Sequence, residues 1–403
     1  MTNDSRVEHE GQPLVTIVVP SLNQGRFIRD AIDSILSQDY PAIELIVMDG
    51  ASTDETQSAV GEYGTSVRFI SEHDRGQADA INKGWRLGRG SILSWLCADD
   101  QLLPGAVREV VRRFTEEPDT TLIYGDYEEW DLSRDRLGTC RVGPPDIWTL
   151  TYRYLYFAQP TAFVRRSAVE SVGFLDETLN WAMDWDLFVR VAWRGSLSYV
   201  PRPLARVRLY GETKTRSGGW KRFREIVRVA RTHTAQRYPP ACSYYAIETL
   251  LFGALRAANR SVQSDTRLSY RANEVIMRVG VSALRCTGFW WSRGWYPDGW
   301  ASKVVERFVW SNGATLRIRG QLPEVLTALH GQELTVEADG IRLARTRLEP
   351  GPFTLEAPVP DPHHRWVRVR LQATRSLVPG GRDLLRGPRR LSYLLEELSI
   401  GTS

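Results

Sequence analysis

The sequence predicts an α/β domain followed by a β-rich module, and three observations support this expectation. The chain has 403 residues, which is more than one hydrophobic core usually supports, so two or three domains are expected. Between residues 14 and 131, short apolar runs alternate with helical patterns, as in repeated βαβ units. After residue 288 the pattern changes to short alternating strands separated by Gly, Pro and Asp turns, which predicts a β-sandwich.

The apolar runs of the first part predict a mostly parallel sheet that is covered by helices on both faces. They read LVTIVVP, ELIVMD, VRFIS and SILSWLCADD along the chain. Residues 26–38 follow the first run and predict a helix, because apolar side chains recur there at three- and four-residue spacing. This apolar stripe comprises Ile28, Ala31, Ile32, Ile35 and Leu36.

Composition places the chain among ordinary globular proteins. Hydrophobic residues make up 42% and charged residues 25% of the chain, which excludes a mostly disordered or fibrous protein. The cysteines lie far apart and form no CxxC pair, so a reducing compartment fits better than a disulfide framework or a zinc site. The N-terminal residues are polar, without the apolar stretch of a secretory signal, and no membrane span is expected. We therefore expect a cytoplasmic protein.

A pair of acids follows one predicted strand, in the stretch WLCADDQLLPG. Two carboxylates at a strand end, Asp99 and Asp100, suit a hard cation such as Mg²⁺ or Mn²⁺, which prefers oxygen ligands. Ligands of open α/β sheets bind outside the carboxyl ends of the strands, where these acids lie together with Asn23 and Asp49. Turn and capping chemistry before Pro104 is the alternative explanation of the pair.

Four motifs occur in one order and together carry a family resemblance. They are VVPSLNQGRFIRDAIDSILSQDY, VMDGASTDET, SEHDRGQADAINKG and the stretch with the acid pair. Over about residues 14–215 the sequence resembles family 2 glycosyltransferases, which have the GT-A fold. The resemblance implies that a nucleoside-diphosphate sugar binds along Pro20 and Asn23. It also implies that Asp49 accepts a hydrogen bond from the base, and that Asp74, Gly76 and Asn82 line the donor pocket.

Structural roles remain open for several of these positions. Asp49, Ser52 and Asp54 also suit the capping of the next helix, and Gly76 also suits a turn. The acid pair resembles the family's Asp-x-Asp motif, but Cys97 stands where the motif often has its first acid. A cysteine is a soft ligand that matches Mg²⁺ and Mn²⁺ poorly, so metal binding is expected to rest on Asp99 and Asp100.

The stretch QPTAFVRRSAVESVGFLDETLNWAMDWDLFVRVAWRG resembles the acceptor half of the same family. Its Asp184 matches the acid of the family's Glu-Asp motif, although Met183 replaces the glutamate. Asp184 is therefore the candidate base that takes the proton from an acceptor hydroxyl, and Asp186 is the second choice. By resemblance, Gln159 is expected to contact the sugar or the acceptor. Trp185 is also expected to contact the acceptor. A purely structural helix acid is the alternative for Asp184.

The stretch RVRLYGETKT resembles a family segment in which a histidine often joins the metal, but Tyr210 stands in its place here. Water and diphosphate oxygens are then expected to complete the coordination. Arg208 and Lys214 are expected to neutralise the departing diphosphate.

A basic helix is predicted over residues 220–237. Eleven Lys and Arg against two Glu lie between residues 202 and 237. The apolar face expected for this helix consists of Trp220, Phe223, Val227 and Ala230. Such a helix can lie peripherally at the inner face of an anionic membrane, but packing of this face inside the protein is the favoured alternative. Nucleic acid is not expected as a partner, because no recognised binding motif accompanies the charge.

These expectations combine into three domains and one activity. The predicted domains are a GT-A domain at 12–237, a helical connector at 238–288 and a β-sandwich accessory domain at 289–403, which weakly resembles modules appended to bacterial polysaccharide enzymes. The predicted activity is metal-dependent, inverting transfer of a sugar to a hydroxyl of a glycan or lipid-linked glycan. A non-catalytic glycan-binding or scaffold protein and a sugar-phosphate nucleotidyltransferase are the alternatives.

Overall fold

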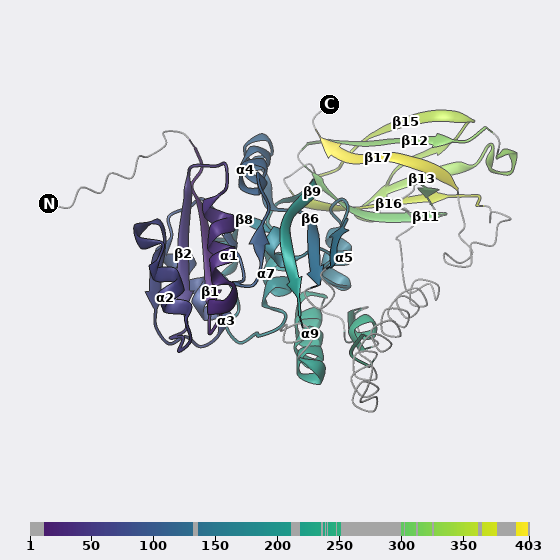
Figure 1. Ribbon diagram of the computed structural model, residues 1–403. Coiled ribbons are helices and arrows are strands. Elements are labelled where there is room, and N and C mark those ends of the chain that lie inside the picture. The colour runs from purple at the N-terminus through teal and green to yellow at the C-terminus, as the bar shows by residue number, and fades with distance from the viewer. Residues whose placement is uncertain are drawn as a thin grey trace. The chain divides into compact units, whose positions relative to one another are not determined.

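A computed structural model of the chain divides it into two compact units, Met1–Ala246 (unit 1) and Ile247–Ser403 (unit 2), each with its own hydrophobic core. Figure 1 shows the elements of both units. Most of the predicted connector, and Lys214, lie outside the described residues. The described residues are 12–131, 136–210, 218–234, 237, 239, 241–246, 248–250, 300–301, 303–311, 313–324, 326–361, 365–376 and 392–401.

Unit 1 is built on a sheet whose described strands follow the order β3-β2-β1-β4-β8-β6-β9-β5, with β7 paired to β6. Strands β3, β2, β1 and β4 run parallel, as do β6 and β9, whereas β5, β7 and β8 pair antiparallel. The predicted α/β class with a parallel-rich sheet is confirmed. The strands are β1 (Val15–Ser21), β2 (Ile43–Asp49), β3 (Arg68–Ser71), β4 (Ile92–Trp95), β5 (Gln101–Leu102), β6 (Thr120–Asp131), β7 (Arg136–Cys140), β8 (Phe163–Arg165) and β9 (Ser196–Leu209).

The first strands and helices alternate along the chain, as the sequence predicts. Strand β1 is buried along its whole length, because helices cover a parallel sheet on both faces. The helices of unit 1 are α1 (Gly25–Leu36), α2 (Thr56–Gly61), α3 (Gln77–Leu87), α4 (Ala106–Glu116), α5 (Ile147–Tyr152), α6 (Arg166–Val172), α7 (Met183–Ala192) and α9 (Gly219–Thr234).

The apolar face of α1 differs from the predicted stripe at one end. Ile28, Ala31, Ile32 and Ile35 are buried as expected, but Leu36 is 42% exposed and Phe27 is buried in addition. Leu36 is the last residue of the helix, where the chain already turns toward β2. A periodic pattern does not locate the residue at which a helix leaves the sheet.

Helix α9 packs with a different face from the one predicted. Ile226, Val229 and Ala230 are its buried residues, whereas Trp220 is 54% exposed. Contacts of α9 with α5 and hydrogen bonds to the segment before α7 turn this face inward. One face of α9 therefore packs inside unit 1, as the alternative to membrane contact expected. Of the predicted apolar face, however, only Ala230 belongs to the buried face.

Unit 2 is β-rich, as expected. Its described strands form one connected sheet in the order β14-β13-β16-β11-β17-β12-β15, with β10 paired to β17. Two antiparallel groups meet at a single parallel bridge, Ser311↔Ile400, so the separate sheets of a β-sandwich are not confirmed. The strands are β10 (Trp300–Ala301), β11 (Val304–Ser311), β12 (Thr315–Leu322), β13 (Glu333–Ala338), β14 (Ile341–Arg347), β15 (Gly351–Pro358), β16 (Arg365–Ala373) and β17 (Tyr393–Gly401).

Strand alternation explains how unit 2 forms its core. In β16, Val367, Val369 and Leu371 are buried, while Arg368 and Arg370 between them are exposed. Alternate residues of a strand point to opposite faces, so one face supplies the core and the other carries charge. Among the described residues of the whole chain, no helix is both long enough and apolar enough to span a membrane.

Candidate active site

The polar loops of unit 1 meet where the parallel strands end. Ser21, the last residue of β1, lies in register with Asp49, the last residue of β2, and Asp49 lies in register with Ser71 of β3. The chain enters the next loop or helix directly after each of these residues. The parallel register therefore brings the predicted donor residues to one edge of the sheet.

Asp49 is held firmly by its own chain. Its side chain is 1% exposed, and its carboxylate accepts hydrogen bonds from the Ser52 amide at 3.0 Å and the Ser71 hydroxyl at 2.6 Å. The Ser52 hydroxyl donates to the other carboxylate oxygen. These contacts fix the loop after β2, while a contact from Asp49 to a nucleotide base stays a prediction.

The loop after β1 is tied to the loop after β2 through Asn23. Its backbone lies in the left-handed region (φ 53°), which asparagine tolerates better than most residues. The Asn23 amide donates to the Ser52 hydroxyl at 2.8 Å, and its side-chain oxygen accepts from the Thr53 amide at 2.9 Å. Pro20 precedes this loop inside the buried strand β1. Asn23 is exposed and borders the edge where the donor is predicted to bind.

Asp54 caps helices, the structural role that the sequence left open for it. Its carboxylate accepts from the amide of Gly25, the first residue of α1, at 2.9 Å. It also accepts from the Thr56 amide, at the first residue of α2, at 3.0 Å. One acid therefore satisfies amide groups at the start of two helices, which explains its position without invoking a ligand.

Asp74 lies beside the end of β2. A Cβ atom on Gly50 would stand 2.7 Å from Asp74 Oδ2, so a larger residue at position 50 would displace the Asp74 side chain. The other Asp74 oxygen accepts from the Gly76 amide at 2.8 Å. Asp74 and Gly76 are therefore close to the Asp49 loop, as the predicted donor pocket requires.

Asn82 has a different place from the predicted pocket lining. Its side chain is 1% exposed, and its amide exchanges hydrogen bonds of 3.0 and 3.1 Å with the backbone of Leu175. It also donates to Glu177 at 3.1 Å. The structure thus gives Asn82 the task of joining α3 to the segment that leads to α7.

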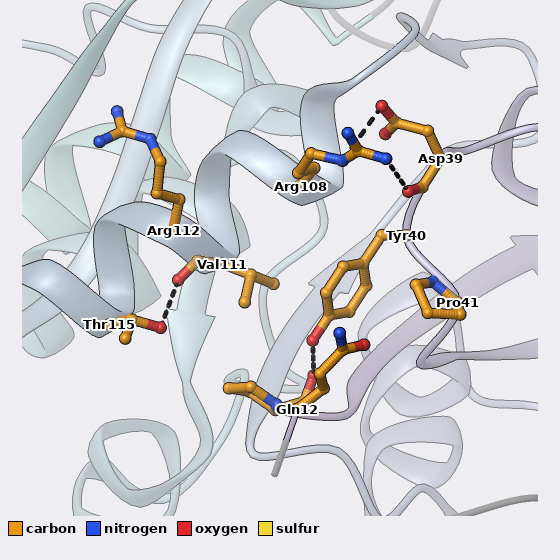
Figure 2. A pocket seen from close by; sticks show the side chains of 9 residues that line it. Gln12, Asp39, Tyr40, Pro41, Arg108, Val111, Arg112 and Thr115 are labelled. Carbon is orange, nitrogen blue, oxygen red and sulfur yellow. Dashed lines mark hydrogen bonds and ion pairs between the residues drawn. The ribbon is translucent and has the colours of Figure 1, made fainter. Parts of the chain in front are cut away.

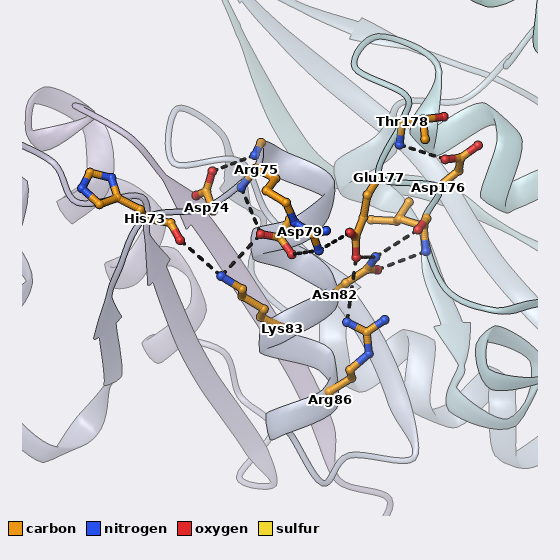
Figure 3. A network of polar contacts seen from close by, with 12 residues as sticks. His73, Asp74, Arg75, Asp79, Asn82, Lys83, Arg86, Asp176, Glu177 and Thr178 are labelled. Carbon is orange, nitrogen blue, oxygen red and sulfur yellow. Dashed lines mark hydrogen bonds and ion pairs between the residues drawn. The ribbon is translucent and has the colours of Figure 1, made fainter.

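Figure 3 shows the polar network around this junction. The buried Asp79 accepts from Arg75, whose guanidinium also pairs with Glu177 at 2.5 Å, and Lys83 lies 3.4 Å from Asp79. The hydrogen bond from Arg75 is the main cause that lowers the pKa of Asp79 to about 2. Sequence analysis missed Asp79 and Glu177. Arg75 is only four residues before Asp79, but Glu177 comes from a distant segment that only the tertiary fold brings to Arg75.

The acid pair forms the strongest candidate for a cation site. The side-chain ligand atoms of Cys97, Asp99 and Asp100 all lie within 4.8 Å of one another, directly after β4. Asp100 is buried and accepts from the Arg208 amide at 3.3 Å, and the Tyr210 hydroxyl donates to Asp99 at 2.8 Å. Burial, followed by the nearby charge of Asp99, raises the pKa of Asp100 well above its ordinary value. A divalent cation would relieve this repulsion, and the two carboxylates fit one.

Cys97 contacts neutral side chains. The Gln77 amide donates to its sulfur at 3.3 Å, and Gln159 Oε1 lies 3.7 Å from the same atom. Gln159 in turn donates to the Trp95 carbonyl at 2.7 Å, which anchors it beside the end of β4. Gln159, the predicted acceptor contact, is therefore close to the acid pair and half-buried.

Arg208 is more enclosed than a surface phosphate ligand. It is 3% exposed, its guanidinium pairs with Asp30, and it lies over the rings of Phe27 (4.9 Å) and Trp130 (5.3 Å). Its Nε is buried without a hydrogen-bond partner among the described residues. Contact of Arg208 with the diphosphate stays a prediction.

Helix α7 carries two aspartates in different surroundings. Asp184 is half-buried in the first turn. Asp186 is buried and accepts from Arg190 at 2.7 and 2.9 Å, and it lies 2.8 Å from His233 Nε2 of α9. Burial opposes ionisation, but His233 and Arg190 together lower the pKa of Asp186. An acid whose charged form is stabilised in this way is a poor base, so the two residues are not equivalent.

Trp185 has a packing role. Its side chain is 2% exposed, its indole N–H donates to the Leu150 carbonyl at 2.6 Å, and its ring contacts Tyr245. The structure thus places the predicted acceptor contact inside the unit. The alternation of tryptophan and aspartate in this motif does not reveal that Trp185 faces α5.

Figure 2 shows a pocket of about 430 Å³ elsewhere in unit 1. Gln12 and Pro13, which precede β1, line one side, and Arg108 and Val111 of α4 line the other. It lies at the amino-terminal end of β1, whereas the predicted donor residues follow the carboxyl ends of the strands. We therefore do not assign the donor to it.

Comparison with known proteins finds similarity to one family of transferases. The model of Glycosyl transferase family 2 matches residues 16–173. An uncharacterized glycosyltransferase of Rickettsia prowazekii is 26% identical over 210 residues, which are 50% of this chain and 66% of that protein. Chondroitin synthase of Escherichia coli is 26% identical over 203 residues, or 50% of this chain and 29% of the synthase.

Among solved structures, a mannosyltransferase from Pyrobaculum calidifontis in complex with GDP-Man and Mn²⁺ is 20% identical, with a TM-score of 0.46 over 69% of this chain and 82% of that chain. The chain spans less than two thirds of the length of the first curated relatives that it matches. The matched segment contains the donor loops and the acid pair. Over residues 16–173, the chain is similar to glycosyl transferase family 2.

Proposed function

We propose that this chain is an inverting glycosyltransferase that moves a sugar from a nucleoside-diphosphate sugar to a hydroxyl of a glycan or lipid-linked glycan. The observation that carries the proposal is the acid pair after β4, which lies at the edge of the sheet where the other donor loops end. An acidic site at this edge fits a cation that bridges protein and diphosphate. The matched family and the similarity to a chondroitin synthase support a glycan as the acceptor.

Asp99 and Asp100 would hold Mn²⁺ or Mg²⁺, with Cys97 as a neighbour outside the coordination. When bound, the cation supplies positive charge against the diphosphate oxygens. Tyr210 orients Asp99 through its hydroxyl, in the way that outer partners orient metal ligands.

The acceptor side relies on Asp184. Its carboxylate takes the proton of the attacking hydroxyl, and the hydroxyl oxygen bonds to the anomeric carbon as the bond to the nucleoside diphosphate breaks. Attack from the face opposite the leaving group inverts the anomeric carbon, so an α-linked donor gives a β-linked product. Asp186 is unsuited to this role, because Arg190 and His233 stabilise its charged form.

One experiment separates the proposal from its alternatives. The purified chain is incubated with a panel of nucleotide-sugars and Mn²⁺, with water as acceptor, and the released products are identified. We expect free nucleoside diphosphate from at least one donor. Release of inorganic diphosphate from sugar phosphate and nucleoside triphosphate would indicate a nucleotidyltransferase. No release from any donor would favour a glycan-binding or scaffold protein.

Peripheral contact with the inner face of a membrane forms a second part of the proposal. Trp220, Lys221, Arg224 and Arg228 are exposed on α9, and together they present an aromatic ring and positive charge. Such a combination binds anionic lipid surfaces. We expect salt-sensitive sedimentation with anionic liposomes, which is lost when Lys221, Arg224 and Arg228 become Gln. Failure of the wild-type chain to sediment at low salt would remove this part.

A further inference from the structure

The amino-terminal end of α7 is capped by a carboxylate from another helix. Glu225 of α9 accepts hydrogen bonds from the backbone amides of Asn180 (3.0 Å), Trp181 and Ala182 (2.7 Å). Ala182, the residue before α7, has no side chain that can cap the helix. The cap is therefore supplied by Glu225, which follows Ala182 by 43 residues in the chain.

A second contact joins the same two helices about one turn into α7. His233, near the end of α9, lies 2.8 Å from Asp186 Oδ1, while Arg190 holds the other oxygen of that carboxylate. Glu225 and His233 are eight residues apart, so both project from one side of α9. Asp184 lies between the two attachment points of α7.

The segment before α7 is also in steric contact with α9. A Cβ atom on Gly218, directly before α9, would stand 2.6 Å from Trp181 Nε1, and Arg228 donates to the Thr178 carbonyl at 3.3 Å. Residues 178–182 thus contact α9 at its beginning, at Glu225 and at Arg228. This contact is absent from the family match, which ends at residue 173.

We infer that Glu225 is a positioning residue that holds Asp184 in place for the transfer reaction. Helix α9 then contributes to the reaction by fixing the start of α7. This inference rests on the proposed function of Asp184. The amides that Glu225 binds belong to the residues directly before the first turn of α7, and loss of the carboxylate leaves these three amides to find new partners. Asp184 follows the last of them by two residues, and small displacements of a reacting group lower the rate strongly.

The charge of Glu225 matters as well as its position. A carboxylate near the start of a helix is favoured by the helix dipole and by charge-assisted hydrogen bonds from the amides. A glutamine at the same place keeps an oxygen acceptor but loses this charge. Lys221, Arg222, Arg224 and Arg228 lie on the same helix as Glu225, and Arg190, Asp186 and His233 form the second contact between α9 and α7.

The test compares Glu225→Ala and Glu225→Gln with the wild type in nucleoside diphosphate release from the donor that reacts fastest, with water as acceptor. For Glu225→Ala we expect kcat to fall by roughly tenfold or more, since misplacement of a catalytic group by about 1 Å can cost a hundredfold. The KM for the donor should stay within about twofold, because the donor loops are elsewhere. The kcat of Glu225→Gln should lie between those of Glu225→Ala and the wild type.

Asp146→Ala is the matched control, since Asp146 caps α5 in the same unit by accepting from the Thr149 amide at 3.1 Å. It tests whether the loss of any helix cap lowers the rate. We expect its kcat to stay within about twofold of the wild type while its Tm falls by an amount similar to that of Glu225→Ala, because caps contribute similar free energies. An equal loss of kcat in both variants would reduce Glu225 to a structural role.

A double-mutant cycle with Asp184→Asn shows whether Glu225 acts through Asp184. If it does, adding Glu225→Gln to Asp184→Asn lowers kcat no further. Multiplicative losses would overturn the inference while leaving the proposed function intact. A near-normal kcat of Asp184→Asn alone would instead contradict Asp184 as the base, and this inference would fall with it.

Discussion

The predicted donor residues, up to the acid pair, and the predicted acceptor residues of α7 both include more acids than the proposed chemistry uses. In each group, different contacts distinguish the structural acids from the proposed reactive acids. In the donor group, Asp54 and Asp79 hold loops and helices through amides and cations, whereas Asp99 and Asp100 stand side by side. Two neighbouring carboxylates repel each other unless a cation binds. Among the donor residues, the closeness of two like charges therefore indicates the candidate cation site.

In the acceptor group, the distinction depends on partners from a distant helix. Asp186 lies two residues after Asp184 on the same helix, yet His233 and Arg190 bind it. Glu225 likewise receives backbone amides. The comparison teaches that residue type and motif position select a group of acids, and that the contacts made by each acid then decide its task.

Asp186→Asn should have the largest effect on folding. The substitution removes the carboxylate from between Arg190 and His233, and breaking a buried ion pair costs about 3 kcal/mol of unfolding free energy at neutral pH. Urea denaturation followed by fluorescence measures this loss. A change below about 0.5 kcal/mol would show that Asp186 is no more structural than an ordinary surface acid.

The contribution of Asp186 to folding stability depends on pH, and its pKa shift gives the sign of this dependence. The pKa of folded Asp186 lies below its ordinary value, so its contribution to stability is complete above the unfolded pKa of about 4 and is lost as the pH falls further. We expect the stability difference between the wild type and Asp186→Asn to shrink below pH 4. If the difference in unfolding free energy between the two proteins were the same at pH 3 as at neutral pH, the lowered pKa of Asp186 would be contradicted.

Asp184→Asn should lower turnover by roughly a hundredfold or more, since general base catalysis typically contributes that much. Donor binding, measured by isothermal calorimetry in Mn²⁺, should remain within about twofold, because the donor residues lie on other loops. Near-normal turnover would move the role of base to another group and erase the proposed difference between the two aspartates.

Asp99→Ala and Asp100→Ala should weaken donor binding in Mn²⁺ by at least about tenfold, the loss typical even of an outer partner of a metal ligand. EDTA should weaken binding to the wild type in the same way. Cys97→Ala is the matched control, which should leave the Mn²⁺ dependence unchanged, because a thiol is a poor ligand for this ion. Full activity in EDTA would show that Arg208 or its neighbours replace the metal.

Removal of residues 294–403 should have the smallest effect. We propose the domain bounds 12–237, 238–288 and 289–403, and unit 1 contains both halves of the candidate site. Nucleoside diphosphate release should therefore stay measurable after truncation, as an activity assay with a circular dichroism check of folding would show. Loss of folding would make the C-terminal module a structural partner instead.

Sequence reasoning reached the α/β class and the location of the candidate site because both depend on local patterns. Runs such as VTIVVPS are buried strands wherever helices cover a parallel sheet, and such strands end in the loops that hold polar residues. The acid pair was recognisable for the same reason. The face of α9 and the role of Trp185 were not, because they depend on which helix lies opposite.

By itself, the sequence determined that parallel strands would carry Asn23, Asp49 and the acid pair to one edge, since register and alternation follow from local patterns of apolar residues. Only the tertiary structure decided which acids receive hydrogen bonds or cations from distant segments. Glu225 lies in a basic stretch where an isolated acid attracts little notice, yet it caps α7. The physical reason is that hydrogen bonds and ion pairs are short-ranged, so an acid's task depends on neighbours that only folding brings within 3 Å.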